Sequence, residues 1–350
     1  MKRNATLNDV AFRAGVSTAT VARVVHERGY VSEDTRARVL SAIKAVDYRS
    51  NSLARSLKQS RTRVIGQVLQ STFPNTFYVQ VALGAERLAT ELGYSLLTYN
   101  VQGDAGAEKK AVEAFLSWRV DAILFITPID SANVNLSLSA GVPAVQVERP
   151  VLETCDHVLV DNYVGARAAM DHLIGFGHRR IAFVGQDPSA QASSISAYVE
   201  RERFKAYQDA LASLGVATDR QLISLGNYYT LRDRSANEDG YRATEWFLAI
   251  DEPPTAIFAS SDILAAGVIQ CLYSRGLNVP GQVSVVGFDD TYAAFVTPML
   301  TTVRLPMEEL GKVAMELVIG RVEGQYVQEE PQMRRFPTKL IIRDSTGPAP

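Results

Sequence analysis

Apolar residues in the first part of the chain recur every three or four positions, which is the spacing of one face of an α-helix. These apolar stripes occupy residues 7–14, 21–25 and 40–46. Thr6, Ser17 and Ser32 lie ahead of the stripes, and residues of these types often cap helix amino termini. Gly15 follows the first stripe, where a left-handed residue commonly ends a helix. The pattern predicts three short helices, with Leu40 on the inner face of the third.

From residue 63 onward, short apolar runs alternate with amphipathic segments. The strand-like runs are 64–70, 94–100, 120–128, 141–148, 180–186, 254–261 and 283–290, and the helical segments are 78–93, 108–119, 206–215 and 262–276. This alternation predicts an α/β fold with parallel sheets and helices on both faces. The series is too long for one ordinary sheet, so we expect two subdomains. Ligands should bind between them, beyond the carboxyl ends of the strands. We expect residues 228–243 to form a lid or a surface loop.

Composition and charge narrow the class of protein. The 350 residues are 47% hydrophobic and 21% charged, as in globular proteins. Residues 1–60 carry a net charge of +6, because 11 lysines and arginines face five acidic residues, whereas the remainder carries −8. A basic head on an acidic body favours a nucleic-acid partner at the head, although a solvated charged face would give the same count.

Two cysteines and four histidines show no metal-ligand spacing, so we expect no metal and no cofactor. Cys155 and Cys271 lie in apolar surroundings, which is typical of buried thiols in a reducing compartment. No apolar run follows Lys2 and Arg3, and no window approaches 18 uninterrupted apolar residues. We therefore expect no signal peptide, no membrane span and a cytoplasmic protein.

Three short helices of this size form either a helix-turn-helix DNA-binding head or a generic three-helix bundle, and periodicity leaves both open. In a helix-turn-helix head the second helix enters the major groove. Arg23 on its outer face can then bind guanine or hold a phosphate.

The segment "TLNDVAFRAGVSTATVARVV" resembles the head of the lactose-repressor (LacI/GalR) family, whose pattern reads approximately T-[LI]-x-D-V-A-x-x-A-G-V-S-x-x-T-V-S-R-V. Ala22 departs from it, since serine is usual there. The resemblance implies a DNA-binding domain at 1–48, with Thr18, Ala19 and Arg23 at base-reading positions, and a hinge helix at 49–62 that pushes Leu57 between base pairs. The expected DNA-binding residues are Thr6, Ser17, Thr18, Ala19, Thr20, Arg23, His26, Asn51, Ala54, Arg55 and Leu57.

The remaining residues, 63–346, resemble the family's two-lobed body, a type I periplasmic-binding-protein fold. The resemblance implies a first lobe at about 63–162 and 306–333, and a second at about 163–305 and 334–346. Thr76 replaces a usual proline and Ser261 a usual asparagine. Aromatic faces, carboxylates and arginines in the cleft favour a polyhydroxylated ligand, with an acid group paired to arginine. The expected effector-binding residues are Phe77, Tyr78, Asp161, Arg201, Arg203, Tyr228, Ser261 and Asp289.

These features predict an effector-responsive transcription regulator, most simply a repressor that binds a palindromic operator as a homodimer. The expected effector is a sugar or sugar acid, and a nucleobase is the alternative. A solute-binding receptor of the same body fold is a second hypothesis, which the DNA-binding head disfavours. We expect no enzyme, because the sequence holds no P-loop, no G-x-G-x-x-G and no G-x-S-x-G, although Asp161 and Asp289 would offer an acid–base pair. No leucine-heptad tail follows Thr346, so a dimer is expected and not a coiled-coil tetramer.

Overall fold

The computed structural model describes residues 5–25, 29–48, 61–70, 76–187, 198–226, 236–326 and 330–350. The chain divides into two compact units, Met1–Thr62 and Arg63–Pro350, which are considered separately below. Several residues predicted to bind DNA or effector lie outside the described residues: His26, Asn51, Ala54, Arg55, Leu57 and Tyr228. Their roles stay predictions.

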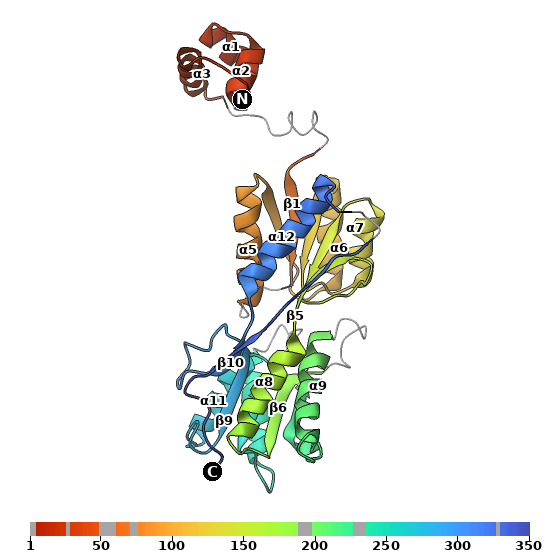
Figure 1. The fold of residues 1–350 in the computed structure, drawn as a ribbon, viewed down its shortest axis with the longest axis vertical. Helices are drawn as coiled ribbons and strands as arrows, with labels where there is room; N and C mark the ends of the chain where they lie inside the picture. The colour runs from red at the N-terminus through yellow and green to blue at the C-terminus, as the bar shows by residue number, and fades with distance from the viewer. Residues whose placement is uncertain are drawn as a thin grey trace. The chain divides into compact units, whose positions relative to one another are not determined.

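The amino-terminal unit contains α1 (Leu7–Ala14), α2 (Thr18–Val25) and α3 (Glu33–Ala45) (Figure 1). Thr6 and Asp9 form a capping box at the start of α1, because the Asp9 carboxylate accepts a hydrogen bond from the Thr6 backbone N–H at 2.7 Å. Gly15 ends α1 with a φ of 65°, in the left-handed region. Ser17 Oγ accepts from the Thr20 N–H at 3.1 Å as α2 begins. The predicted helix boundaries are confirmed.

The core of this unit is built from small β-branched residues and alanines. Val10, Val21 and Val39 are fully buried, one from each helix. Leu40 is 48% exposed, so its predicted inward position is wrong. Neighbouring positions on a helix point about 100° apart. The buried face of α3 contains Val39 and Ala42, so Leu40 points away from it.

The larger unit contains two six-stranded sheets in its described residues, and we name the two halves the first and second lobes. The first lobe has the strand order β11-β5-β4-β3-β1-β2, and all its pairs are parallel. Its strands are β1 (Val64–Leu69), β2 (Ser95–Asn100), β3 (Ala122–Ile126), β4 (Ala144–Val147), β5 (Asp156–Val160) and β11 (Met333–Phe336). Its helices are α5 (Phe77–Glu91), α6 (Ala105–Ser117), α7 (Ser131–Ser139) and α12 (Met307–Glu323).

The second lobe repeats this plan with the strand order β12-β10-β9-β8-β6-β7, in which only the β10–β12 pair is antiparallel among the described strands. Its strands are β6 (Ile181–Gln186), β7 (Ile223–Gly226), β8 (Ala256–Ala259), β9 (Ser284–Asp289), β10 (Thr301–Arg304) and β12 (Lys339–Ile341). Its helices are α8 (Asn162–Gly175), α9 (Tyr198–Ala212), α10 (Ala236–Leu248) and α11 (Asp262–Ser274), with a 3-10 turn at Arg220–Leu222.

The chain passes between the lobes three times: after β5, after β10 and after β11 (Figure 1). Each lobe is therefore assembled from separate stretches of sequence, and α12 joins the first lobe although it follows β10 of the second. The predicted α/β fold with parallel sheets is confirmed. The loop expected at 228–243 is wrong for residues 236–243, which begin α10 and pack against α11. In the described part of the chain, no helix is long and apolar enough to cross a membrane.

Candidate functional site

The outer face of α2 is the candidate DNA-reading surface of the amino-terminal unit. Ser17, Thr18, Ala19 and Arg23 are exposed, whereas Val21 and Val24 on the opposite face are buried. Thr20 is half-buried, and Thr6 is exposed but its hydroxyl donates to Asp9 in the α1 cap. The helix thus presents short side chains and one long cation, a surface able to approach base edges closely.

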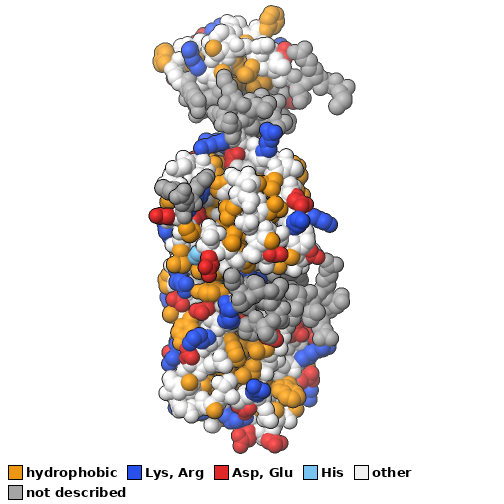
Figure 2. All heavy atoms as spheres, turned by 90° about the vertical axis from the view of Figure 1, so that its right-hand side faces the viewer, with side chains coloured by type: hydrophobic (Ala, Val, Ile, Leu, Met, Phe, Trp, Pro, Cys, Tyr) orange, Lys and Arg blue, Asp and Glu red, His pale blue; other side chains and the backbone are white. Residues whose placement is uncertain are grey.

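On the face of the body shown in Figure 2, the described residues form no stripe of basic side chains. Lysine and arginine side chains there are interspersed with aspartate and glutamate. DNA binding through phosphate contacts needs a local excess of positive charge. Residues 1–60 carry a net charge of +6 and the remainder −8, so the candidate DNA interface lies in the amino-terminal unit.

A cavity lies between the two lobes, with about 600 Å³ of empty space including its open mouth. Most lining residues follow or end parallel strands, or lie on the first two turns of α5 and α9, and Phe183 lies within β6. The lining residues are Phe77, Tyr78, Thr127, Glu148, Arg149, Phe183, Gln186, Val199, Glu200, Arg203, Ser260 and Asp289.

Three lining residues have a backbone conformation that is rare outside glycine. Thr127 follows β3 with a φ of 54°, Glu148 follows β4 with a φ of 66°, and Asp289 ends β9 with a φ of 105°. Such conformations cost of order 1–3 kcal/mol each and cluster at functional sites. The three strand ends are thus turned sharply at the wall of the cavity.

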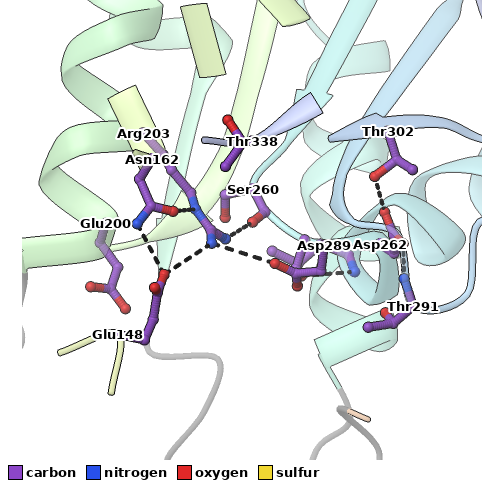
Figure 3. Close-up of polar contacts among 12 residues, drawn as sticks. Glu148, Asn162, Glu200, Arg203, Ser260, Asp262, Asp289, Thr291, Thr302 and Thr338 are labelled. Carbon is purple, nitrogen blue, oxygen red and sulfur yellow. Dashed lines mark hydrogen bonds and ion pairs between the residues drawn. The ribbon is translucent and has the colours of Figure 1, made fainter. Parts of the chain in front are cut away.

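Arg203 lies at the centre of the polar wall and is only 6% exposed (Figure 3). Its Nε donates to Asn162 Oδ1 at 2.9 Å, and Nη1 donates to the Ser260 carbonyl at 2.6 Å. Its Nη2 lies 3.4 Å from Asp289 Oδ1 and 3.9 Å from Glu148 Oε1. The guanidinium is therefore largely occupied by the protein, with two carboxylates beside one cation.

A second ion pair crosses the cavity between Arg149 Nη2 and Glu200 Oε1, 3.1 Å apart. Both side chains are less than one-tenth exposed. Glu148 and Arg149 are consecutive residues of the first lobe, whereas Glu200 and Arg203 lie one turn apart on α9 of the second. Glu148 and Arg149 of the first lobe thus each face a residue of opposite charge in the second lobe.

Burial controls the ionisation of the carboxylates around Arg203. It raises the pKa of Glu148 and of Asp289 to about 7, although the Arg203 charge opposes the shift in both. Burial and the Asp289 charge raise the pKa of Asp262 to about 7. Asp262 lies behind the lining and accepts from the Thr291 and Tyr292 N–H groups at 2.7 and 3.3 Å (Figure 3). Asp262 therefore holds the loop after β9.

Four lining side chains carry buried polar atoms that have no hydrogen-bond partner among the described residues. The atoms are Glu148 Oε2, Arg149 Nε, Glu200 Oε2 and both amide atoms of Gln186. Buried polar atoms are nearly always paired, so unpaired ones concentrated in one place indicate a position that a ligand or ordered water satisfies. Three of the atoms accept hydrogen bonds and two donate.

Aromatic side chains form the apolar part of the lining. Phe77 and Tyr78 at the start of α5 are in edge-to-face contact, with ring centroids 5.5 Å apart. The Tyr78 hydroxyl donates to Gln70 Oε1 at 3.2 Å, and the same oxygen accepts from Thr127 at 2.8 Å. Phe183 of β6 supplies the third ring. Rings of this kind can pack on a sugar face or on a base.

The structure brings together only part of the effector set predicted from the sequence. Phe77, Tyr78, Arg203 and Asp289 line the cavity, whereas Arg201 is exposed and is not among the lining residues.

Asp161 and Ser261 also lie outside the lining. Asp161 Oδ1 caps α8 by accepting from the Val164 N–H at 3.1 Å. Ser261 is buried and its Oγ caps α11 by accepting from the Leu264 N–H at 3.4 Å. Both side chains cap a helix: Ser261 directly follows the lining residue Ser260, and Asp161 precedes Asn162, which accepts from Arg203.

Sequence reasoning missed eight lining residues: Thr127, Glu148, Arg149, Phe183, Gln186, Val199, Glu200 and Ser260. A usable signal was present for four of them. Thr127, Glu148, Gln186 and Ser260 each end or directly follow an apolar strand run, the position at which parallel sheets bind ligands. Arg149 lies one position beyond Glu148 after the same strand run, whereas Glu200 carried no signal beyond its charge.

Residues 6–51 match the sequence profile of the bacterial regulatory proteins of the lacI family, and residues 170–346 match that of a periplasmic binding protein-like domain. The chain is 31% identical to the HTH-type transcriptional repressor PurR of Mannheimia succiniciproducens over 97% of this chain and 98% of that protein. The chain belongs to the lacI family. It is a transcriptional repressor of that family, and not an enzyme.

Other members of the lacI family show the same extent of similarity. The ribose operon repressor of Escherichia coli K12 is 32% identical over 93% of this chain and 96% of that protein. The solved lac repressor dimer bound to operator and the anti-inducer ONPF has a TM-score of 0.83 and 27% identity, over 99% of this chain and all of that one. The similarity thus includes both the head and the body.

Proposed function

We propose that this lacI-family repressor binds a palindromic operator as a homodimer, and that a neutral sugar in the interlobe cavity alters its affinity for that operator. One observation carries the choice of ligand. The cavity wall holds buried, unpartnered acceptors and donors beside an excess of carboxylates: Glu148, Glu200 and Asp289 against Arg149 and Arg203.

Hydroxyl groups match this lining better than acid groups do. A hydroxyl both donates and accepts, so it can satisfy Glu200 Oε2 and Arg149 Nε alike. A carboxylate or phosphate only accepts, and it would add charge to a site where acidic groups already outnumber arginines. The Arg203 guanidinium already contacts two carboxylates, and Arg149 is paired with Glu200. These contacts favour a sugar over a sugar acid or a sugar phosphate.

The relatives support a small-molecule effector without naming this one. The ribose operon repressor bears a sugar in its name, and the lac repressor structure contains operator and the anti-inducer ONPF. Phe77, Tyr78 and Phe183 would also accept a flat base, so a nucleobase is the competing ligand.

A thermal-shift screen tests the ligand class. The panel contains D-ribose, D-glucose and cellobiose as neutral sugars, D-glucuronate and ribose 5-phosphate as anions, and guanine and hypoxanthine as bases. A ligand at 100 times its dissociation constant stabilises the protein by about 2.7 kcal/mol. We expect a shift with a neutral sugar and a change in operator affinity with the same compound. A shift only with anions or bases would contradict the proposed class.

The DNA-binding role of the hinge is tested at Leu57, which lies outside the described residues. A leucine pushed between base pairs acts only where the duplex can be kinked. Leu57→Ala should therefore weaken specific operator binding much more than binding to random DNA. Leu53→Ala is the matched control, since it removes the same side chain four positions away. Equal losses on both kinds of DNA would remove Leu57 from the wedge role.

A further inference from the structure

The Arg149–Glu200 ion pair is buried, joins the two lobes directly, and is shorter than the neighbouring interlobe pair Glu148–Arg203. Arg149 follows β4 of the first lobe and Glu200 lies on the first turn of α9 in the second. Their charged atoms are 3.1 Å apart, and each side chain is less than one-tenth exposed. Neither residue belonged to the effector set expected from the sequence.

Separating the lobes would leave each of these charges without its partner. Breaking a buried ion pair by removing one member is strongly destabilising, because the remaining charge stays desolvated. Water entering an opened cleft would offset part of this cost. The pair therefore favours the closed arrangement, and its neighbour Glu148–Arg203 acts in the same direction over a longer distance of 3.9 Å.

Each member of the pair also retains one unsatisfied atom. Arg149 uses Nη2 for Glu200, while its Nε has no partner among the described residues. Glu200 uses Oε1, while its Oε2 has none. One donor and one acceptor, supplied by opposite lobes, thus remain beside the cavity that both residues line.

We propose that Arg149 and Glu200 are specificity-determining residues that act as an interlobe latch: their ion pair holds the lobes closed, and their remaining atoms together bind a hydroxyl group of a neutral effector. The hydroxyl accepts from Arg149 Nε and donates to Glu200 Oε2. The second half of this inference rests on the proposed sugar-binding function, whereas the first half does not. An ionised acid group cannot donate to Glu200, so the pair binds a hydroxyl group in preference to a carboxylate or phosphate group.

The latch is tested without any ligand by measuring the distance between the lobes. Nitroxide labels are placed on Ala140→Cys in the first lobe and Ala212→Cys in the second, both at exposed positions, in the full-length chain. Cys155 and Cys271 are buried, and labelling of the unsubstituted chain measures their background. Electron–electron double resonance then gives the distance distribution.

Labelled chains are diluted with an excess of unlabelled chain, so that distances between the protomers of a homodimer do not contribute. We expect one narrow distribution for the starting chain. Arg149→Met and Glu200→Gln should each add a second distance and raise the ratio of open to closed molecules at least tenfold, about 1.4 kcal/mol. The double variant should raise the ratio of open to closed molecules no further than the single variant with the larger effect. The effects of substituting two residues in one contact do not add. Lys109→Gln removes one member of an exposed pair on α6 and serves as the control, with no expected change.

Unchanged distances in both single variants, or effects that simply add in the double variant, would overturn the latch. The neutral sugar that shifts the melting temperature of the starting chain is then titrated into the same variants. We expect each single variant to bind it at least tenfold more weakly. Single variants that open the lobes but bind the sugar with unchanged affinity would overturn the hydroxyl contact. A panel in which no neutral sugar binds would contradict the proposed function, while the distance measurement would still decide the latch.

Discussion

At the scale of single residues, the cavity wall contains carboxylates whose charged forms are disfavoured by burial. Glu148 and Asp289 are each about 5% exposed or less and share one guanidinium, Arg203. Their raised pKa values mean that the folded state binds protons more tightly than the unfolded chain does. Since both also have a left-handed backbone, the wall combines electrostatic and conformational strain at the same strand ends. A ligand hydroxyl that donates to these carboxylates would relieve the electrostatic part.

This arrangement predicts a pH dependence of stability. Below about pH 3 both carboxylates are protonated in either state and carry no penalty. As the pH rises towards 7 the unfolded chain releases its protons first, so the free energy of unfolding falls. Asp289→Asn removes one such group. The difference in unfolding free energy between pH 5 and pH 7.5, measured by urea denaturation, should be smaller in this variant by at least ~1 kcal/mol.

The exposed Asp251 supplies the control for that experiment, since Asp251→Asn makes the same chemical change on the surface. Its pH profile should coincide with that of the starting chain. A profile for Asp289→Asn that also coincides would show that the carboxylate is ionised at little cost, contrary to the burial observed.

At the scale of elements, each lobe contains a helix pair that crosses on glycines. In the first lobe, a Cβ added to Gly311 of α12 would lie 1.8 Å from the Val81 carbonyl of α5, and one added to Gly84 of α5 would lie 1.9 Å from the Glu308 carbonyl of α12. In the second lobe, Gly240 and Gly267 have the same relation between α10 and α11. Both contacts involve backbone, which cannot rotate aside. The close approach of these helices therefore depends on the missing side chains.

Gly311→Ala should consequently destabilise the body, because α5 and α12 must separate to admit one methyl group. Overpacking of this kind typically costs 1–3 kcal/mol. Gly175→Ala provides a matched control, since Gly175 is also helical but has open space at its Cβ position. Its substitution should be neutral or slightly stabilising, as alanine favours helices. Equal melting temperatures for the two variants would contradict the close crossing.

The sequence predicted the elements better than the contacts between them. Strand runs and helix caps are local signals, so β1, β9 and the capping box at Thr6 could be predicted directly. Asp161 and Ser261 show the limit of such signals, because a short polar residue between a strand and a helix caps the helix as readily as it binds a ligand. The pairing of Arg149 with Glu200 joins residues 51 positions apart and depends on how two lobes meet. No local pattern carries that information.

At the scale of the whole molecule, the chain combines α2, the candidate DNA-reading helix of one unit, with a candidate ligand cavity in the other. Regulation requires that the two binding events share free energy. If the effector changes the operator affinity by some factor, the operator must change the effector affinity by the same factor. Such factors typically run from about 5 to 150.

We therefore expect matched factors from two independent measurements. Fluorescence anisotropy gives the operator dissociation constant with and without saturating sugar, and calorimetry gives the sugar dissociation constant with and without operator. Arg23→Ala is the control: loss of an exposed cation on α2 should weaken operator binding but leave the sugar affinity of the free protein unchanged, since Arg23 lies outside the body. A factor of one in both measurements, with sugar bound and operator bound, would mean that the cavity does not regulate DNA binding. A factor above five in both would establish the coupling, and its direction would show whether the sugar releases the operator or strengthens its binding.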